Sequence, residues 1–209
     1  MFLKDKINEK YDNPKIYVVS DTHFSHQNII KYCDRPFKDE HHMNEVLIHK
    51  WNKVIKEDDV VIHLGDVGFG SINKIMDDLR RLNGIKYLVP GNHDYGKHLI
   101  KYETNEIFEV LRGGAVFFDE STILTHKPYK KHMMEKAVTK NPNTINVHGH
   151  IHNKTLQSFQ KDFADLGVED RYEDYDFGRY LNVSVEMINY KPILIEDMIH
   201  IHDLFEGAK

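Results

Sequence analysis

Ile16-Tyr17-Val18-Val19-Ser20-Asp21-Thr22-His23 joins a short apolar run to a loop that carries a carboxylate and an imidazole. The run is β-branched and has no helical period, so it predicts a buried strand over Ile16–Val19. Two later stretches repeat this arrangement. Val60–Leu64 runs directly into Gly65-Asp66, and Ile85–Val89 delivers Pro90-Gly91-Asn92-His93-Asp94.

Helical patterns separate these three strands. Apolar residues recur at helical spacing over about 41–56 and again over 71–82, where Ser71 is the expected N-cap and Asn83-Gly84 the end. The order strand, helix, strand, helix, strand is typical of a parallel sheet, in which ligands collect beyond the carboxyl ends of the strands. The polar loops after the three strands are therefore candidates for a common site.

The second half of the chain predicts a second sheet. A hairpin, three later strands and three helical segments are expected there. At the other end of the chain, residues 1–15 are expected to form a short arm. With no internal repeat or linker, we expect a single α/β domain over residues 1–209, in which the two halves contribute two packed sheets flanked by helices. The expected strands are 115–118, 122–125, 144–148, 181–185 and 192–195, and the helices are 97–111, 130–138 and 196–204.

Composition narrows the class of protein. An apolar share of 40% and a charged share of 29% are typical of a globular protein, and no apolar run approaches the roughly 20 residues that span a bilayer. Cys33 is the only cysteine, which excludes an intramolecular disulfide and favours a cytoplasmic location. A formal charge of −5 argues against a general polyanion binder.

The stretch Val147-His148-Gly149-His150-Ile151-His152-Asn153 places three imidazoles within five residues at the end of an expected strand. An extended segment sends alternate side chains to one face, so His150 and His152 can reach one site, while Gly149 lets the backbone turn close to it. Imidazole is a common metal ligand, but two histidines do not complete a coordination sphere. Hard oxygen donors and one more imidazole follow the other strands: Asp21, Asp66, Asn92 and His126.

These segments resemble, in order, the five motifs of the calcineurin-like metallophosphoesterases: Asp21-x-His23, Gly65-Asp66, Gly91-Asn92-His93-Asp94, His126 and Gly149-His150-x-His152. The resemblance spans residues 21–152 and implies an αββα sandwich with a dinuclear metal centre. The alternative, in which these groups are turn carboxylates and core histidines, must explain the same placement five times.

The resemblance also implies a role for each residue. Asp66 would bridge the two metals, and His93 would protonate the leaving oxygen or stabilise the charged transition state, with Asp94 orienting it. A metal ion lowers the pKa of bound water from about 15.7 toward ~7, which makes hydroxide available for attack at phosphorus. The implied ligands are Asp21, His23, Asp66 and His152 for one metal, and Asp66, Asn92, His126 and His150 for the other.

We therefore expect a metal-dependent phosphoesterase that hydrolyses a small phosphoester, such as a nucleotide or cyclic nucleotide. Mn²⁺ is the first expectation, and the mixed ligand set also suits Fe, Zn, Ni or Co. Nucleic acid is not the favoured substrate because the chain is acidic, but a nuclease of the same fold and a non-catalytic metal-binding scaffold are the alternatives. No membrane partner is expected, and the sequence leaves the oligomeric state open.

Two further regions carry open interpretations. Asn28 and Arg35 follow the first motif and are candidate substrate contacts, since Arg can bind a phosphate with two parallel hydrogen bonds, although a structural salt bridge explains Arg35 equally well. Residues 155–180 look like an insertion, and seven acidic residues lie between Asp162 and Asp176. The insertion is expected to be a lid, an oligomer contact or merely a mobile loop.

Overall fold

The first sheet contains five strands, and its register aligns the strand ends that carry the first three motifs. The computed structural model describes residues 1–158 and 176–206. The strand order is β4-β3-β2-β1-β9, with β1 to β4 parallel and β9 antiparallel to β1. Val19 pairs with His63, and His63 with Leu88, so the three loops that follow leave one edge together. The strands are β1 (Ile16–Val19), β2 (Val60–His63), β3 (Ile85–Leu88), β4 (Glu109–Val110) and β9 (Ile193–Leu194).

The second sheet has four strands in the order β5-β6-β7-β8. β5 runs antiparallel to β6, while β6, β7 and β8 are parallel, so the loops after β6 and β7 also leave one edge. β6 and β7 are buried along their whole length, as is typical of strands in the middle of a sheet that is covered on both faces. The strands are β5 (Ala115–Phe117), β6 (Thr122–Thr125), β7 (Ile145–His148) and β8 (Tyr180–Asn182).

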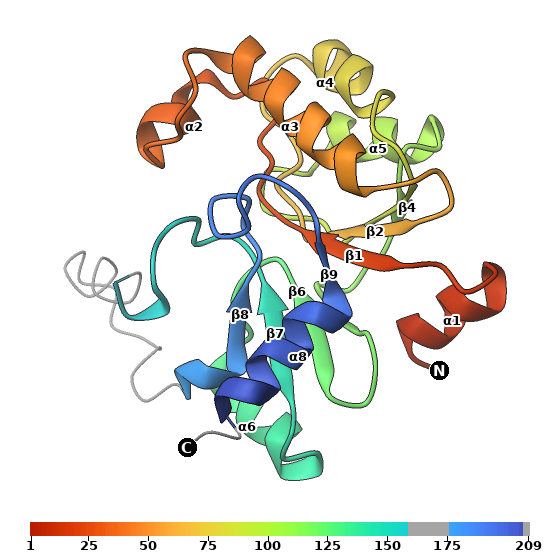
Figure 1. Cartoon of the computed structure of the whole chain (residues 1–209), viewed down its shortest axis with the longest axis vertical. Helices are drawn as coiled ribbons and strands as arrows, with labels where there is room; N and C mark the ends of the chain where they lie inside the picture. The colour runs from red at the N-terminus through yellow and green to blue at the C-terminus, as the bar shows by residue number, and fades with distance from the viewer. Residues whose placement is uncertain (159–175, 207–209) are drawn as a thin grey trace.

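Helices lie outside the sheets. α2, α3, α4 and α5 gather on one side of the first sheet, and the second sheet lies on the other side with α6 and α8 (Figure 1). α3 begins at a true cap, because the Asp39 side chain accepts a hydrogen bond from the His42 N–H at 2.8 Å. The helices are α1 (Leu3–Lys10), α2 (Gln27–Tyr32), α3 (Glu40–Val54), α4 (Ile72–Leu79), α5 (Lys97–Thr104), α6 (Lys131–Lys140) and α8 (Ile195–Glu206), and η1 (Phe177–Arg179) is a 3₁₀ turn.

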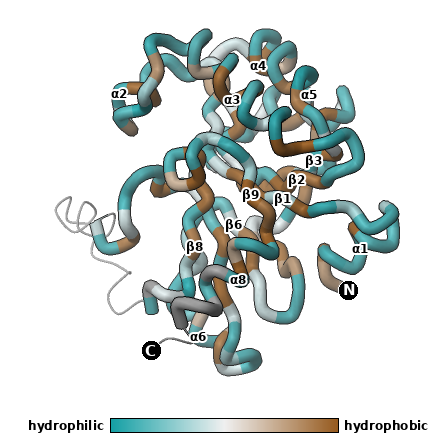
Figure 2. Tube along the Cα trace, in the orientation of Figure 1, coloured by the Kyte–Doolittle hydropathy of each residue, from teal (hydrophilic) through white to brown (hydrophobic). Residues whose placement is uncertain are grey.

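One hydrophobic core serves both sheets. A single cluster of buried side chains includes Val18 and Ile62 from the first sheet and Leu124 and Val147 from the second. Apolar segments follow the strands through the interior, while the outer helices alternate between polar and apolar residues (Figure 2). The expected two-sheet sandwich is confirmed, and the shared core joins its halves into one domain.

Several expected elements differ in the structure. The N-terminal arm contains α1, whose buried Leu3 and Ile7 lie one helical turn apart. The helix expected over 97–111 ends at Thr104, because Glu106 adopts a left-handed φ of 56° that turns the chain into β4. The C-terminal strand β9 does not join the second sheet as expected from its place in the chain, because it pairs with β1 of the first sheet.

The expected insertion over 155–180 and its acidic tract fall mainly on residues 159–175, which lie outside the described residues. Asp176, the last acid of that tract, is described and accepts a hydrogen bond from Arg179 at 2.8 Å. Within residues 1–158 and 176–206, no helix combines the length and apolar character needed to cross a membrane.

Candidate metal centre

Motif loops from both sheets meet at one place. Within the first sheet, the Asp21 N–H donates to the Gly65 carbonyl at 3.0 Å and the His23 N–H to the Asp66 carbonyl at 3.1 Å. Across the sheets, the His150 N–H donates to Asp21 Oδ2 at 2.8 Å. The predicted convergence of the five motif loops is therefore present in the fold.

Gly149 makes the approach of the second sheet possible. A Cβ atom at this position would overlap Ser20 Oγ and Asp21 Oδ2. The need for glycine here is steric, since the backbone of the β7 loop packs directly against the loop after β1. This contact brings His150 and His152 up to Asp21.

Asp21, His23 and His152 form the first donor cluster, in which the candidate ligand atoms all lie within 4.8 Å of one another. His23 Nε2 and His152 Nε2 are each 4.0 Å from Asp21 Oδ1. Asp21 Oδ1 and His23 Nε2 are buried and have no hydrogen-bond partner within the described residues. Unpaired buried polar atoms are costly, so a cation between them fits this cluster.

Asp66, His126 and His150 form the second donor cluster, and Asn92 completes it. His126 Nδ1 donates to the Leu64 carbonyl at 2.8 Å, which directs Nε2 into the site. That Nε2 lies 3.0 Å from Asn92 Oδ1, 3.2 Å from His150 Nδ1 and 3.4 Å from Asp66 Oδ2. A neutral His126 would present its Nε2 lone pair to the oxygens of Asn92 and Asp66. Burial lowers the pKa of His126, but contacts with Asp66 and Asp21 raise it overall, so either a proton on Nε2 or a cation fits this position.

Asp66 lies between the two clusters. Its Oδ2 is 3.4 Å from His126 Nε2 in the second cluster and 3.8 Å from His23 Nε2 in the first. Its Oδ1 accepts a hydrogen bond from the His93 N–H at 2.9 Å, which fixes the plane of the carboxylate. The position suits a carboxylate that is shared by two cations.

Burial lowers the pKa of two candidate ligand imidazoles, and contacts outweigh it at a third. It lowers the pKa of His23 well below its usual value and that of His150 to about 3, so both are neutral, as metal ligation requires. Burial also opposes charge on His152, but contacts with Cys33, Glu186 and Asp21 raise the pKa of His152 to about 10. Metal binding to His152 would therefore require this imidazole to lose a proton, which the cation would replace.

His93 borders the site without belonging to either cluster. Its Nε2 is 3.9 Å from Asp66 Oδ2, its side chain is 36% exposed, and its ring packs edge-on against Phe69 with centroids 5.4 Å apart. This exposure leaves the imidazole accessible to a bound ester. The role of His93 toward a leaving group stays a prediction.

Asp94 lies between the second and third motif loops. Its buried carboxylate accepts the N–H groups of Asp66 at 2.6 Å, Gly91 at 2.9 Å and Val67 at 3.1 Å. Burial raises the pKa of Asp94 to about 6 despite these bonds. Asp94 therefore holds these two loops together, while its expected role in orienting the His93 ring stays a prediction.

Arg35 is buried, and each nitrogen of its guanidinium group has a partner. They reach the Glu186 carboxylate, the carbonyls of Asp21 and Thr22, and Met43 Sδ. The structural interpretation of Arg35 therefore holds, and a phosphate cannot bind it bidentately without breaking these contacts. Asn28 is exposed on α2 and stays a prediction as a substrate contact.

Two residues with a place in the site were missed from the sequence. Ser184 donates to Asp21 Oδ2 at 3.0 Å, and Glu186 lies 3.1 Å from His152 Nδ1. Ser184 lies within the strand expected over 181–185, and Glu186 follows that strand directly. The rule that found the other motifs, a polar residue just beyond a buried strand, would have found Glu186 as well.

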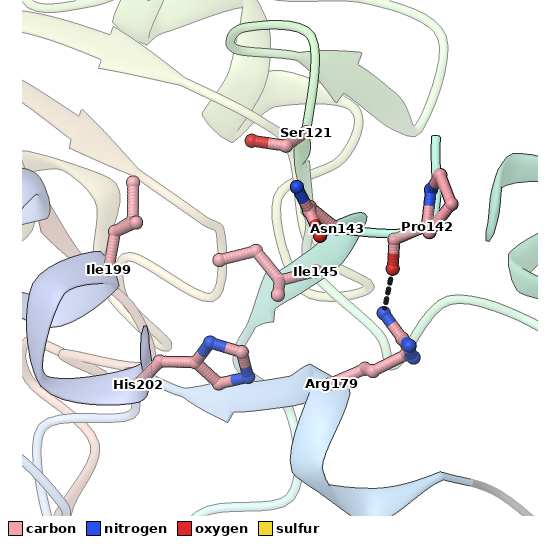
Figure 3. A pocket seen from close by; sticks show the side chains of 7 residues that line it. All are labelled: Ser121, Pro142, Asn143, Ile145, Arg179, Ile199 and His202. Atoms are coloured by element: carbon pink, nitrogen blue, oxygen red, sulfur yellow. Dashed lines mark hydrogen bonds between the residues drawn. The ribbon is translucent and has the colours of Figure 1, made fainter. Parts of the chain in front are cut away.

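The cavity in Figure 3 is separate from the metal centre. It has a volume of about 420 Å³ and opens between α8 and the β7–β8 side of the second sheet. Arg179 beside it is tied to the Pro142 carbonyl at 2.6 Å, and His202 Nε2 lies 2.6 Å from the Gly178 carbonyl. None of its lining residues belongs to the five motifs, so the cavity is not part of the candidate metal centre.

Comparison with known proteins identifies the family. The sequence pattern of the calcineurin-like phosphoesterases matches residues 14–195, which include both sheets and every motif. The chain belongs to the calcineurin-like phosphoesterase family. An uncharacterized protein of Methanocaldococcus jannaschii is 35% identical over 188 residues, covering 87% of this chain and 88% of that protein.

A solved structure has a similar fold. A protein of unknown function from Aquifex aeolicus is 27% identical to this chain, with a TM-score of 0.64 over 90% of this chain and 100% of its own. Neither relative has an assigned activity in its name. The family thus establishes a phosphoesterase fold with a candidate metal centre.

Proposed function

We propose that the protein is a dinuclear-metal phosphoesterase that hydrolyses a small phosphoester. The observation that carries this proposal is the pair of donor clusters joined by Asp66, with unpaired buried atoms on Asp21 and His23. Asp21, His23, Asp66 and His152 would hold one cation, and Asp66, Asn92, His126 and His150 the other. A scaffold without activity has no use for His93 beside this set.

When bound by these residues, two divalent cations would supply charge stabilisation for phosphoryl oxygens and a lowered water pKa, toward ~7, as suits in-line displacement. Two aspartates and neutral imidazoles leave the loaded site with a formal charge of +2, so it attracts phosphate within an acidic protein. His93 stands at the open side to serve the departing oxygen. Mn²⁺ is the first candidate, with Fe, Zn, Ni and Co also suited to N and O ligands.

The preferred substrate class is a nucleotide or cyclic nucleotide. Phe69 is 44% exposed and stands between the imidazoles of His26 and His93, with ring centroids 4.6 and 5.4 Å away. Tyr32, 71% exposed, extends this aromatic surface from His26 at 6.3 Å. Exposed aromatic rings close to His93, the proposed acid for the leaving group, favour a substrate with a planar base, since stacking contributes about 1–3 kcal/mol per base. We place this activity in the cytoplasm, as the single cysteine favours.

The test is metal-dependent hydrolysis by the intact protein. Chelator-stripped protein is titrated with Mn²⁺, Fe²⁺, Zn²⁺, Ni²⁺ or Co²⁺ and assayed on aryl monoesters and diesters, with bound metal counted by elemental analysis. We expect activity that follows occupancy up to two ions per chain. Asp66→Asn should reduce occupancy of both sites, and Asn92→Ala mainly of one. Two bound ions without hydrolysis of any ester would favour the scaffold.

The substrate class is tested separately. Nucleotides, cyclic nucleotides, sugar phosphates, and single- and double-stranded DNA and RNA are compared at matched salt. We expect nucleotides to be preferred, and Phe69→Ala to lower kcat/KM for nucleotides more than for sugar phosphates, with Phe117→Ala as the exposed aromatic control. Rapid cleavage of a polymer with no activity on small esters would establish the nuclease instead.

A further inference from the structure

A buried chain of contacts continues from His152 away from the metal centre. His152 Nε2 faces Asp21 Oδ1 at 4.0 Å, while its Nδ1 lies 3.1 Å from Glu186 Oε1. The Glu186 side chain is only 4% exposed. The two ring nitrogens of His152 are thus divided between the metal side and a buried carboxylate.

The fold places Glu186 beside the first motif. After β8 the chain pairs with the end of β1 through a parallel bridge between Ser20 and Ser184. The Ser20 N–H donates to the Val183 carbonyl at 2.9 Å, and the Val185 N–H to the Ser20 carbonyl at 3.0 Å. Glu186 follows immediately, so its backbone is held by the strand whose loop carries Asp21.

Arg35 fixes the Glu186 side chain. Its Nε donates to Glu186 Oε1 at 2.9 Å, its Nη2 forms an ion pair with the same oxygen at 2.7 Å, and Nη2 donates to the Asp21 carbonyl at 2.7 Å. The side chain of Arg35 is fully buried. The guanidinium therefore locks the carboxylate against the backbone of a candidate ligand, and the carboxylate in turn meets His152.

This cluster is unsuited to a third metal. The candidate ligand atoms of Cys33, His152 and Glu186 lie within 4.8 Å of one another, a spacing that a cation can occupy. Glu186 Oε2 is buried without a hydrogen-bond partner among the described residues, but the charge of Arg35, 2.7 Å from Glu186 Oε1, repels a cation beside this carboxylate. A carboxylate that accepts the imidazole N–H explains the contacts better.

We propose that Glu186 is a positioning residue for the metal centre, which accepts the Nδ1–H of His152 and so fixes the tautomer and ring orientation that direct Nε2 to a cation. The proposal rests on the proposed function only in taking His152 as a ligand. Such carboxylate partners increase the basicity of a ligating imidazole, and their loss typically costs 10–100-fold in metal affinity.

Glu186→Gln is the first test, since glutamine keeps the shape and removes the charge. We expect one of the two Mn²⁺ ions to bind about 10–100-fold more weakly by calorimetric titration, and the other to keep its affinity. Excess Mn²⁺ should restore most of the lost hydrolysis, which a general loss of structure would not allow. Glu196→Gln is the matched control, because the Glu196 side chain is 68% exposed on α8.

A metal-independent measurement separates this proposal from the proposed function. In metal-free wild-type protein, ¹⁵N-resolved NMR should show a slowly exchanging His152 Nδ1–H that is lost or shifted upfield in Glu186→Gln and retained in Glu196→Gln. Wild-type protein that shows this signal but binds no metal would refute the dinuclear function and leave the Glu186 contact standing. Unchanged affinity for both ions in Glu186→Gln, together with an unchanged Nδ1–H signal, would overturn the positioning role.

If Glu186→Gln fails to fold, as judged by circular dichroism, Arg35→Lys tests the same contact from its other side. Lysine keeps the charge but cannot make the paired hydrogen bonds that lock the carboxylate. Weakened binding of one Mn²⁺ ion in a folded Arg35→Lys protein supports the proposal. Wild-type affinity for both ions contradicts it.

Discussion

Five candidate ligands hold a left-handed backbone conformation that only glycine adopts easily. Their φ angles run from 51° to 72°, and each costs of order 1–3 kcal/mol unless neighbouring contacts impose it. The loop hydrogen bonds to Gly65, Asp66 and Asp21 supply such contacts. Backbone strain concentrated at candidate ligands indicates that the direction of their side chains is favoured over local stability. The five are Asp21, His23, Asp66, His150 and His152.

The variant His93→Asn is expected to reduce catalysis without reducing metal binding, because His93 belongs to neither donor cluster. General acid catalysis contributes roughly 10²–10⁴-fold, so His93→Asn should lose about that factor in kcat on an alkyl phosphoester, whose alkoxide must be protonated as it leaves. A p-nitrophenyl ester should lose less, because its phenolate is stable without a proton. Both esters are assayed on wild-type and mutant protein, with metal content measured.

The exposed His41 provides the control, as His41→Asn should leave both rates unchanged. An equal loss on the two esters would assign His93 to stabilisation of transition-state charge. Loss of a metal ion from His93→Asn would show that this histidine is a ligand.

The loop after β7, which carries Gly149, His150 and His152, is the element that joins the two sheets at the site. Gly149→Ala places a methyl group against Ser20 and Asp21, so the loop must move away from β1. Because this loop carries one histidine of each cluster, we expect both metal sites to weaken together. Metal titration and thermal unfolding measure the effect.

Gly113→Ala is the comparison for this element. Its Cβ meets nothing within 4 Å, although its φ of 115° adds a conformational cost. It should therefore lose stability without loss of metal affinity. Gly149→Ala with two tightly bound ions would show that the close approach of the β7 loop to β1 is not needed for the centre.

The whole molecule is expected to unfold as one unit, because its two sheets share a core. Leu124 is fully buried in the second sheet, and Leu124→Ala should cost about 2–5 kcal/mol. Trp51, the only tryptophan, lies on α3 beside the first sheet and reports on the other half of the molecule. Its fluorescence midpoint in urea should fall together with the circular dichroism midpoint.

Phe117→Ala, on a side chain that is half exposed, should shift both midpoints much less. A Leu124→Ala protein whose Trp51 transition stays at the wild-type urea concentration would mean that the two sheets unfold separately. Coincident shifts would support a single cooperative domain.

Local patterns in the sequence determined the strands and the motif residues at their ends. The run Ile16–Val19 and the runs near Val60 and Ile85 are apolar without helical period, and a strand is the only regular element of that length that buries them. The order of carboxylate, amide and imidazole groups likewise predicted the metal chemistry. Those inferences depend on residues a few positions apart.

Tertiary structure alone decided which distant residues meet. The His150–Asp21 hydrogen bond joins residues 129 positions apart, and the Arg35–Glu186 contact spans 151. The choice between substrate contact and salt bridge for Arg35, the loop-holding role of Asp94 and the pairing of β9 with β1 all depend on such packing. Periodicity tells which face of an element is buried, but not which partner buries it, because that choice is made by the free energy of the whole core.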